Sequence, residues 1–87
     1  MRYIDIIRGN VDNHRARRGI TQRALGEAVG ISRPAFSAKL HGHSPFDIGL
    51  LLRVAAVLQV DVRELMEDIE QAEDLAHEEP KQEGAAA

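Results

Sequence analysis

TQRALGEAVGISRPAFSAKL, residues 21–40, is the stretch that decides the fold of this 87-residue chain. Its larger apolar residues fall in two short runs with helical spacing. They are Leu25, Val29, Ile31, Phe36 and Leu40. Gly30 lies between the runs, where a chain that reverses direction needs a positive φ, which glycine adopts without steric cost. Gly26 would weaken a helix by about 1 kcal/mol relative to Ala, so we expect another helix to cross close against it. The pattern predicts two short helices joined by a tight turn.

Capping residues set the limits of these two helices. Thr21 and Ser32 each place a hydroxyl where it can accept a hydrogen bond from an unpaired backbone N–H in the first turn. Pro34 falls in the first turn of the second helix, where its missing N–H costs little. The second helix is therefore predicted to run from Arg33 to about His41.

Helical periodicity continues on both sides of this motif. A first helix is predicted from Tyr3 to Arg18, ending at Gly19. Its inward positions are Ile4, Ile7, Val11 and His14. After a turn, Asp47 can cap a helix that is apolar on most sides and that we expect at the centre of the core. The apolar residues of that helix are Ile48, Leu50, Leu51, Leu52, Val54, Ala55, Val57 and Leu58.

A last helix is predicted from Val62 to about Glu78, because Asp61 and Glu64 have the spacing of a capping box. Its apolar residues are spaced by three and four, which makes a short stripe. They are Val62, Leu65, Ile69, Ala72 and Ala76. The stripe either docks on the parent domain or pairs with the same helix of a second subunit. Residues 80–87 combine charge, Gly and small side chains without periodicity and are predicted to be disordered.

Composition restricts the class of protein. A chain of 87 residues with 44% hydrophobic residues, one Tyr, two Phe and no Trp supports one small aliphatic helical domain. The absence of Cys excludes disulfides and thiolate metal sites and fits a reducing cytoplasm. No apolar run approaches the roughly 20 residues that a membrane helix needs, and Asp5 interrupts any signal-like segment. We therefore expect a soluble, unprocessed protein with no membrane partner.

The net charge of −3 conceals a division along the chain. Residues 1–60 carry nine basic residues and four acids, a net +5, whereas residues 61–87 carry two basic residues and ten acids, a net −8. Electrostatic binding depends on the charge of the contacting face, so a basic head remains compatible with a nucleic-acid partner. The acidic tail needs a separate explanation.

The segment Ile20–Met66 resembles the lambda-repressor and Cro family of phage and bacterial regulators, the XRE-like helix-turn-helix proteins. The resemblance rests on Thr21 and Gln22, on the turn Gly30-Ile31-Ser32, on Gly42 after the second motif helix, and on the segment Val60–Leu65. It implies an all-α, five-helix lambda-repressor-like fold with an extended C-terminal helix. It also implies sequence-specific binding of duplex DNA by the second motif helix, as a dimer on a pseudo-palindromic operator.

These expectations define an organisation and a setting. Residues 1–66 would form the helix-turn-helix DNA-binding domain, residues 67–79 an acidic helical extension able to dimerise, and residues 80–87 the disordered tail. The protein would be a cytoplasmic transcriptional regulator, a repressor rather than an activator, in the nucleoid of a bacterium or in a phage-infected host. No cofactor is expected.

Two positions depart from the family pattern. Lys39 stands where the family usually has an apolar residue, and Gln59 stands where a glycine usually ends the fourth helix. Leu40 can take over the burial while the stem of Lys39 lies along the surface with its ammonium in water. Gln59 must adopt a left-handed conformation or end the helix differently.

The residues expected to contact DNA cluster on the second motif helix and beside it. Arg33 is the leading base-reading candidate because its guanidinium can donate two hydrogen bonds to guanine, with a phosphate contact as the alternative. Pro34 and Ala35 can touch a thymine methyl, although Pro34 is explained equally well as a helix-starting residue. The full set is Gln22, Arg23, Ser32, Arg33, Pro34, Ala35, Ser37, Ala38, Lys39, His41 and His43.

Members of this set have different expected roles. Ser37 can bond a base or a phosphate, and Ala38 is small enough to let the helix approach the groove. The resemblance implies that Gln22 contacts a phosphate and braces the recognition helix. The remaining polar residues can neutralise phosphates without reading sequence, or can be ordinary surface groups. These are Arg23, Lys39, His41 and His43.

Other classes of function have weaker support. His41 and His43 without Cys or convergent carboxylates make a poor metal-ligand set. Ser37 near His41 lacks the oriented base and oxyanion pocket that hydrolysis needs, so no catalytic or metal role is assigned. The acidic tail can bind a protein partner, as in an antitoxin, can fold back on the basic head, or can simply aid solubility. A helix-turn-helix used only for protein contacts is the third class.

Overall fold

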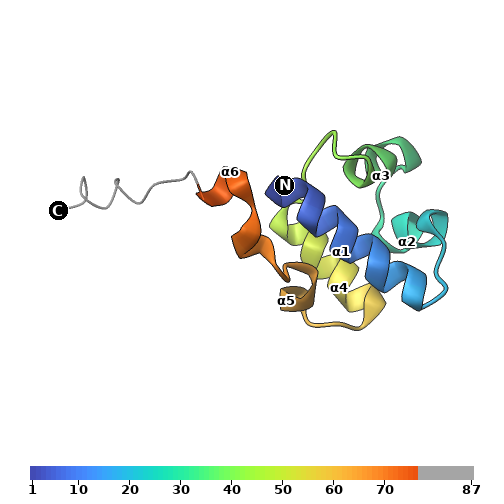
Figure 1. Cartoon of the computed structure of the whole chain (residues 1–87). Coiled ribbons are helices and arrows are strands. Elements are labelled where there is room, and N and C mark those ends of the chain that lie inside the picture. The colour runs from blue at the N-terminus through green and yellow to red at the C-terminus, as the bar shows by residue number, and fades with distance from the viewer. Residues whose placement is uncertain (77–87) are drawn as a thin grey trace.

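The computed structural model describes residues 1–76, and every regular element in that part of the chain is helical (Figure 1). The elements are α1 (Tyr3–Arg17), α2 (Gln22–Val29), α3 (Arg33–Leu40), α4 (Ile48–Leu58), α5 (Val62–Leu65), the 3₁₀ helix η1 (Ile69–Gln71) and α6 (Glu73–Ala76). The predicted all-α class is confirmed. The predicted disorder of residues 80–87 lies outside the described residues.

An aliphatic core forms where α1, α2 and α5 pack around α4. The largest fully buried side chains come from these four helices, and each is at most 1% exposed to solvent. They are Leu25, Leu50, Leu58, Leu65, Val11 and Val54. Burial of a Val or Leu side chain stabilises a fold by about 1.5–3 kcal/mol. The core therefore supplies a rigid base on which α2 and α3 are held.

The turn between α2 and α3 has the predicted local chemistry. Thr21 Oγ1 accepts from the backbone N–H of Ala24 at 3.0 Å, and Ser32 Oγ accepts from that of Ala35 at 3.2 Å, so both predicted N-caps are confirmed. Gly30 has φ +80°, the left-handed conformation that the reversal requires. The helix boundaries that were predicted from these residues are therefore set by local hydrogen bonds.

Gly26 lies where α3 crosses closest to α2. A Cβ on Gly26 would come within 3.2 Å of Cδ2 of Phe36, which is tighter than an ordinary van der Waals contact. The expected close approach of another helix is confirmed. The missing side chain lets the Phe36 ring pack directly on the α2 backbone.

Two later turns also follow the predicted pattern. Gly42 has φ +80°, and His43 donates its backbone N–H to the Ala38 carbonyl at 2.8 Å, which closes α3 with a Schellman-type bond. Gln59 adopts φ +59°, so the left-handed alternative at the end of α4 is the one realised. A non-glycine residue in this conformation carries a cost of about 1 kcal/mol or more.

The predicted continuous helix over residues 62–78 is wrong, because α5 ends at Leu65. Asn10 Nδ2 donates to the carbonyl of Leu65 at 3.0 Å, which is the acceptor that Ile69 would need in a continuing helix. Ile69 instead donates its backbone N–H to the Met66 carbonyl, and Asp68 takes φ +69°. The extended C-terminal helix is therefore replaced by α5, η1 and α6 in the described residues.

The apolar stripe of this segment docks on its own domain, the first of the two alternatives. Leu65 and Ala72 are fully buried, and Val62 and Ile69 pack against the core. The segment packs against α1 through α5 and η1. Those side chains are consequently not available to form the predicted dimerising helix.

The segment α6 lies against the start of α1 (Figure 1). Asp74 Oδ1 accepts the backbone N–H of Tyr3 at 2.9 Å, and Glu73 donates its own backbone N–H to the Met1 carbonyl at 3.0 Å. The Met1 ammonium also pairs with the Glu73 carboxylate at 3.2 Å. Acidic residues from the end of the described chain thus complete the N-terminus of α1, which lacks a side-chain cap of its own.

The predicted capping box of Asp61 and Glu64 is confirmed. Because of Asp61, the free energy of unfolding should depend on pH in the acid range. The Arg63 side chain, and then the Arg63 backbone N–H, lower the pKa of Asp61 from 3.8 to about 2. Because the folded pKa is the lower one, the stabilisation is present above about pH 4 and is lost as the pH falls through 2. We expect Asp61→Asn to lower Tm at pH 7 and the deficit to vanish toward pH 2. Calorimetry across this range measures it, and a constant Tm deficit down to pH 2 would contradict the assignment.

Candidate nucleic-acid interface

One face of helix α3 packs against the core, and the other is exposed to solvent. Phe36 and Leu40 point into the core, and the Phe36 ring meets Phe46 edge-on, with 6.3 Å between centroids and an interplanar angle of 88°. The first turn of α3 and its outward face are exposed. The exposed residues are Ser32, Arg33, Pro34, Ala35 and Ser37. All five belong to the predicted DNA-binding set, and the structure brings them together on one surface.

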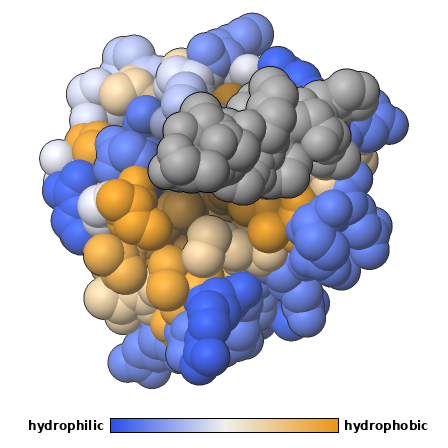
Figure 2. Space-filling model, turned by 90° about the vertical axis from the view of Figure 1, so that its left-hand side faces the viewer, coloured by the Kyte–Doolittle hydropathy of each residue, from blue (hydrophilic) through white to orange (hydrophobic). Residues whose placement is uncertain are grey.

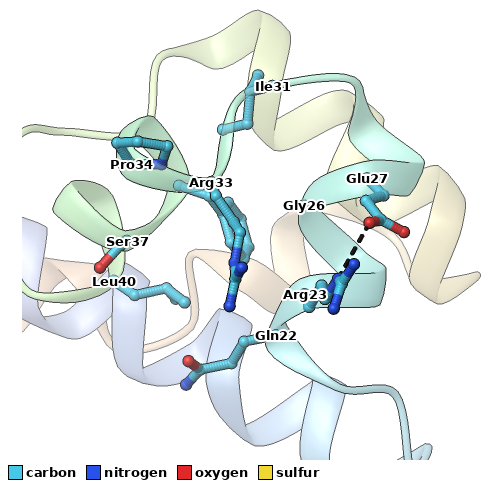
Figure 3. Close-up of a pocket in the computed structure, with 10 residues that line it drawn as sticks. Gln22, Arg23, Gly26, Glu27, Ile31, Arg33, Pro34, Ser37 and Leu40 are labelled. Atoms are coloured by element: carbon cyan, nitrogen blue, oxygen red, sulfur yellow. Dashed lines mark hydrogen bonds and ion pairs between the residues drawn. The ribbon is translucent and has the colours of Figure 1, made fainter.

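A groove of about 350 Å³ separates α2 from α3 (Figure 3). Its apolar lining comes from Gly26, Ile31, Pro34, Phe36 and Leu40, and its polar lining from Gln22, Arg23, Glu27, Arg33 and Ser37. The Arg33 side chain extends along the groove in the direction of Gln22 (Figure 3). Gly26 and the Phe36 ring pack against each other in its lining.

Arg33 has no protein partner within residues 1–76. Among the Arg and Lys residues of this described part, Arg33 and Arg17 alone make no side-chain hydrogen bond or ion pair, whereas the side chains of the others are bonded to carboxylates, carbonyls or His14. A guanidinium presents five N–H donors in a planar fork. Those of Arg33 are available to an acceptor outside the protein, at the exposed start of the helix.

The start of α2 carries the other polar residues near the groove. Gln22 Nε2 donates to Asp12 Oδ1 at 3.3 Å, which ties the first turn of α2 to α1. The pKa of Asp12 is lowered, first by Arg15 and then by Gln22, so its carboxylate holds this contact in the charged form. Arg23 pairs with Glu27 at 3.2 Å, and both side chains are well exposed. An exposed pair of this kind contributes about 0–1 kcal/mol, so a phosphate can compete for Arg23.

The N-termini of α2 and α3 are both suited to negatively charged ligands. Neither helix has an acidic residue in its first turn. The positive end of the helix dipole and the free N–H groups there favour anions. This electrostatic feature does not depend on any single side chain.

The end of α3 holds the remaining predicted residues. His41 Nδ1 lies 2.8 Å from the Ser37 carbonyl oxygen, so this nitrogen carries a proton and donates. The His41 and His43 rings stack with 6.4 Å between centroids. Ala38 is half-buried. The ammonium of Lys39 donates to the Pro45 carbonyl at 3.0 Å, which corrects the expectation that it ends in water. Lys39 therefore fastens the loop after α3.

Two arginines outside the predicted set position the motif. Arg8 Nη1, from α1, donates to the Leu40 carbonyl at 3.0 Å at the end of α3. Arg53 Nη1, from α4, donates to the Val29 carbonyl at 3.0 Å at the end of α2. Asp5 holds Arg8 at 2.9 Å, and the Arg8 and Arg2 side chains lower the pKa of Asp5. No local sequence signal could have found these contacts, because they join residues 32 and 24 positions apart.

Arg15 and Arg18 act locally at the end of α1. Arg15 donates to the Ile20 carbonyl at 2.6 Å, and Arg18 donates to the His14 carbonyl at 3.0 Å. The Arg18 bond satisfies a carbonyl that the end of α1 leaves unpaired, and the Arg15 bond ties α1 to the chain that follows it. Within residues 1–76, no helix has the length and apolar character needed to cross a membrane.

Comparison with known proteins agrees with this geometry. No curated protein and no solved structure matches the chain. A family model described as the Cro/C1-type HTH DNA-binding domain matches residues 10–71, which is more than half of the chain and includes the whole of α2, the turn and α3. The resemblance to Cro and lambda repressor is thereby confirmed, and the chain belongs to the Cro/C1-type helix-turn-helix DNA-binding domain family.

Proposed function

We propose that this protein is a transcriptional repressor that binds a two-fold related operator in duplex DNA as a homodimer. The observation that carries the proposal is the exposed first turn of α3, where the Arg33 guanidinium has no partner within residues 1–76. In helix-turn-helix proteins the N-terminal residues of the second helix contact base edges in the major groove. A free guanidinium at this position suits the O6 and N7 acceptors of guanine.

The exposed residues divide into two groups by their chemistry. Base contacts fall to Arg33 and to its small or apolar neighbours, which suit a thymine methyl or a single hydrogen bond. These neighbours are Pro34, Ala35, Ser37 and Ala38. Phosphate contacts fall to Gln22, Arg23, Ser32, Lys39, His41 and His43. Phosphate contacts fix the position of the protein without reading sequence, so specificity rests on the first group.

A dimer follows from the small footprint of one recognition helix. Two linked helices multiply affinity through effective concentration, and a two-fold protein requires a pseudo-palindromic site. Repression is the direct consequence of such binding when the operator overlaps a promoter. We place this activity in the cytoplasm of a bacterium or a phage-infected host, the setting that the family resemblance implies.

Selection of bound sequences from a random duplex pool tests the proposal. We expect an enriched motif with two-fold symmetry, and an affinity for it that falls steeply as salt rises, because each neutralised phosphate contributes about −0.9 to the log–log slope. No enrichment and no binding at low salt would refute the proposal. That outcome would favour a helix-turn-helix that makes protein contacts only.

A second candidate function is capture of a protein partner by the acidic C-terminal segment, as in an antitoxin. Residues 61–76 carry seven acids and one arginine, a net −6. Glu67 and Glu70 are exposed and make no ion pair within the described residues. The same DNA-binding measurement on a chain ending at Ala76 tests what residues 77–87 contribute. Tighter DNA binding would indicate that they compete with phosphate, and unchanged binding would leave a partner or a passive role.

The shortened chain must keep all residues up to Ala76. A chain ending at Met66, which the predicted domain limits would suggest, loses Ala72 from the core and the Asp74 carboxylate from the start of α1. Its unfolding would be mistaken for loss of function.

A further inference from the structure

Helix α4 has an uncovered apolar face, although it lies at the centre of the core. Ile48 is 61% exposed and Leu52 is 52% exposed, and both are among the most exposed large hydrophobic residues of the described chain. Ala56, one turn further, is also exposed. Figure 2 shows apolar surface on the side of the molecule where α1 and α4 begin. We call Ile48, Leu52 and Ala56 the α4 stripe. Exposed apolar side chains grouped on one helix face are typical of interaction sites.

The α4 stripe is complementary to itself. Its three residues are spaced four apart, so Leu52 is the midpoint between Ile48 and Ala56. If two copies of α4 meet antiparallel about a two-fold axis at Leu52, each Leu52 faces the other. The large Ile48 of each copy then faces the small Ala56 of the other copy, so this contact occurs once on each side of the axis. An isologous interface requires this pairing of a surface with itself, and alternation of large and small residues lets two helices approach closely.

The charges of α4 also favour a second copy as the occupant. Arg53 is the one charged residue between Ile48 and Gln59. It lies about 100° around the helix from Leu52, and its guanidinium is held by the Val29 carbonyl. Two α4 stripes can therefore meet without burying an unpaired charge, which would be costly. A strongly charged partner would find no complementary group on this face.

We propose that two copies of this chain associate through the α4 stripe in an antiparallel, two-fold arrangement. The interface supplies the homodimer of the proposed function, and its biological role rests on that function. An 11-residue helix offers less than the roughly 800 Å² per partner of a standard stable interface. The free dimer should therefore dissociate on dilution, and binding of both subunits to one operator should stabilise it.

Single cysteines test the arrangement directly, because the chain has none of its own. Leu52→Cys should oxidise to a disulfide-linked dimer, since the residue lies on the two-fold axis. Ile48→Cys and Ala56→Cys should form few dimers when oxidised separately and a mixed dimer when oxidised together. Efficient self-linking of Ile48→Cys without mixed linking would indicate a parallel pair and overturn the antiparallel arrangement.

Sedimentation of Leu52→Glu and Leu75→Glu at high concentration supplies the matched control. Both residues are exposed leucines, and Leu75, at 39%, lies on α6 outside the stripe. We expect Leu52→Glu to be monomeric with an unchanged circular dichroism spectrum, and Leu75→Glu to form dimers as the unaltered chain does. A monomeric unaltered chain, a Leu52→Cys chain that forms no disulfide-linked dimer, or a dimer that survives Leu52→Glu would overturn the proposal.

DNA binding separates this inference from the proposed function. Leu52→Glu should bind a single half-site as well as the unaltered chain, and should lose about a hundredfold in affinity for the full operator because the effective-concentration gain is gone. If the Leu52→Cys chain cross-links as expected and the unaltered chain binds no DNA, the proposed function fails and the interface stands. If affinity for the full operator is unchanged by Leu52→Glu, the interface is not the one used on DNA.

Discussion

Arg33→Ala is expected to remove most of the sequence discrimination at one position of each half-site. A bidentate contact between arginine and guanine discriminates against other bases by about 1–3 kcal/mol, or about 5- to 150-fold. Affinity for one half-site should fall by this factor, and affinity of the dimer for the selected operator by about its square because both subunits lose the contact, whereas affinity for random duplex should change little. Fluorescence anisotropy with the selected site and with a site altered at the guanine measures both quantities.

Two further variants make this test specific. Arg33→Lys keeps the charge but loses the planar fork, so it should restore general affinity without restoring discrimination. Arg17→Ala removes the other arginine that has no partner in the described residues, and its effect on discrimination should be negligible. A uniform loss of affinity over all sequences, with a salt slope smaller by about 1 for each bound subunit, would show that Arg33 binds a phosphate instead.

Phe36→Ala is expected to destabilise the fold by about 3–5 kcal/mol, the range for truncation of a buried aromatic residue. The Phe36 ring fills the space beside Gly26, packs edge-on against Phe46 and is the main anchor of α3. A domain of this size has a total stability of only about 5–15 kcal/mol. We expect Tm to fall by about 12 °C or more, as measured by circular dichroism.

Ser37→Ala is the matched control for this substitution. Ser37 is the next residue of α3 but points outward, where its hydroxyl bonds only His41. Its replacement should change stability by no more than about 0.5 kcal/mol. If Phe36→Ala costs less than about 1 kcal/mol, α3 is held by other contacts and the account of its anchoring is wrong.

Local interactions account for the parts of the fold that could be predicted. The caps at Thr21 and Ser32, the reversal at Gly30 and the capping box at Asp61 each involve residues no more than five positions apart. Such hydrogen bonds depend on backbone conformation and on one nearby side chain, so the sequence pattern is sufficient.

The rest was decided by segments that meet only in the folded chain. The local pattern over residues 62–78 predicted one continuous helix. Asn10, 55 positions from Leu65, donates a hydrogen bond to the Leu65 carbonyl and so helps to end α5. Arg8 and Arg53 support the ends of α3 and α2 from other helices, and no periodicity marks them among the surface arginines. The exposure of Leu52 likewise depends on which faces of α4 the other helices cover. The amino-acid sequence by itself determined where the helices begin and turn, because those interactions are local. The tertiary structure decided which polar groups brace the DNA-facing helix and which apolar face stays open, because those outcomes depend on the packing of distant segments.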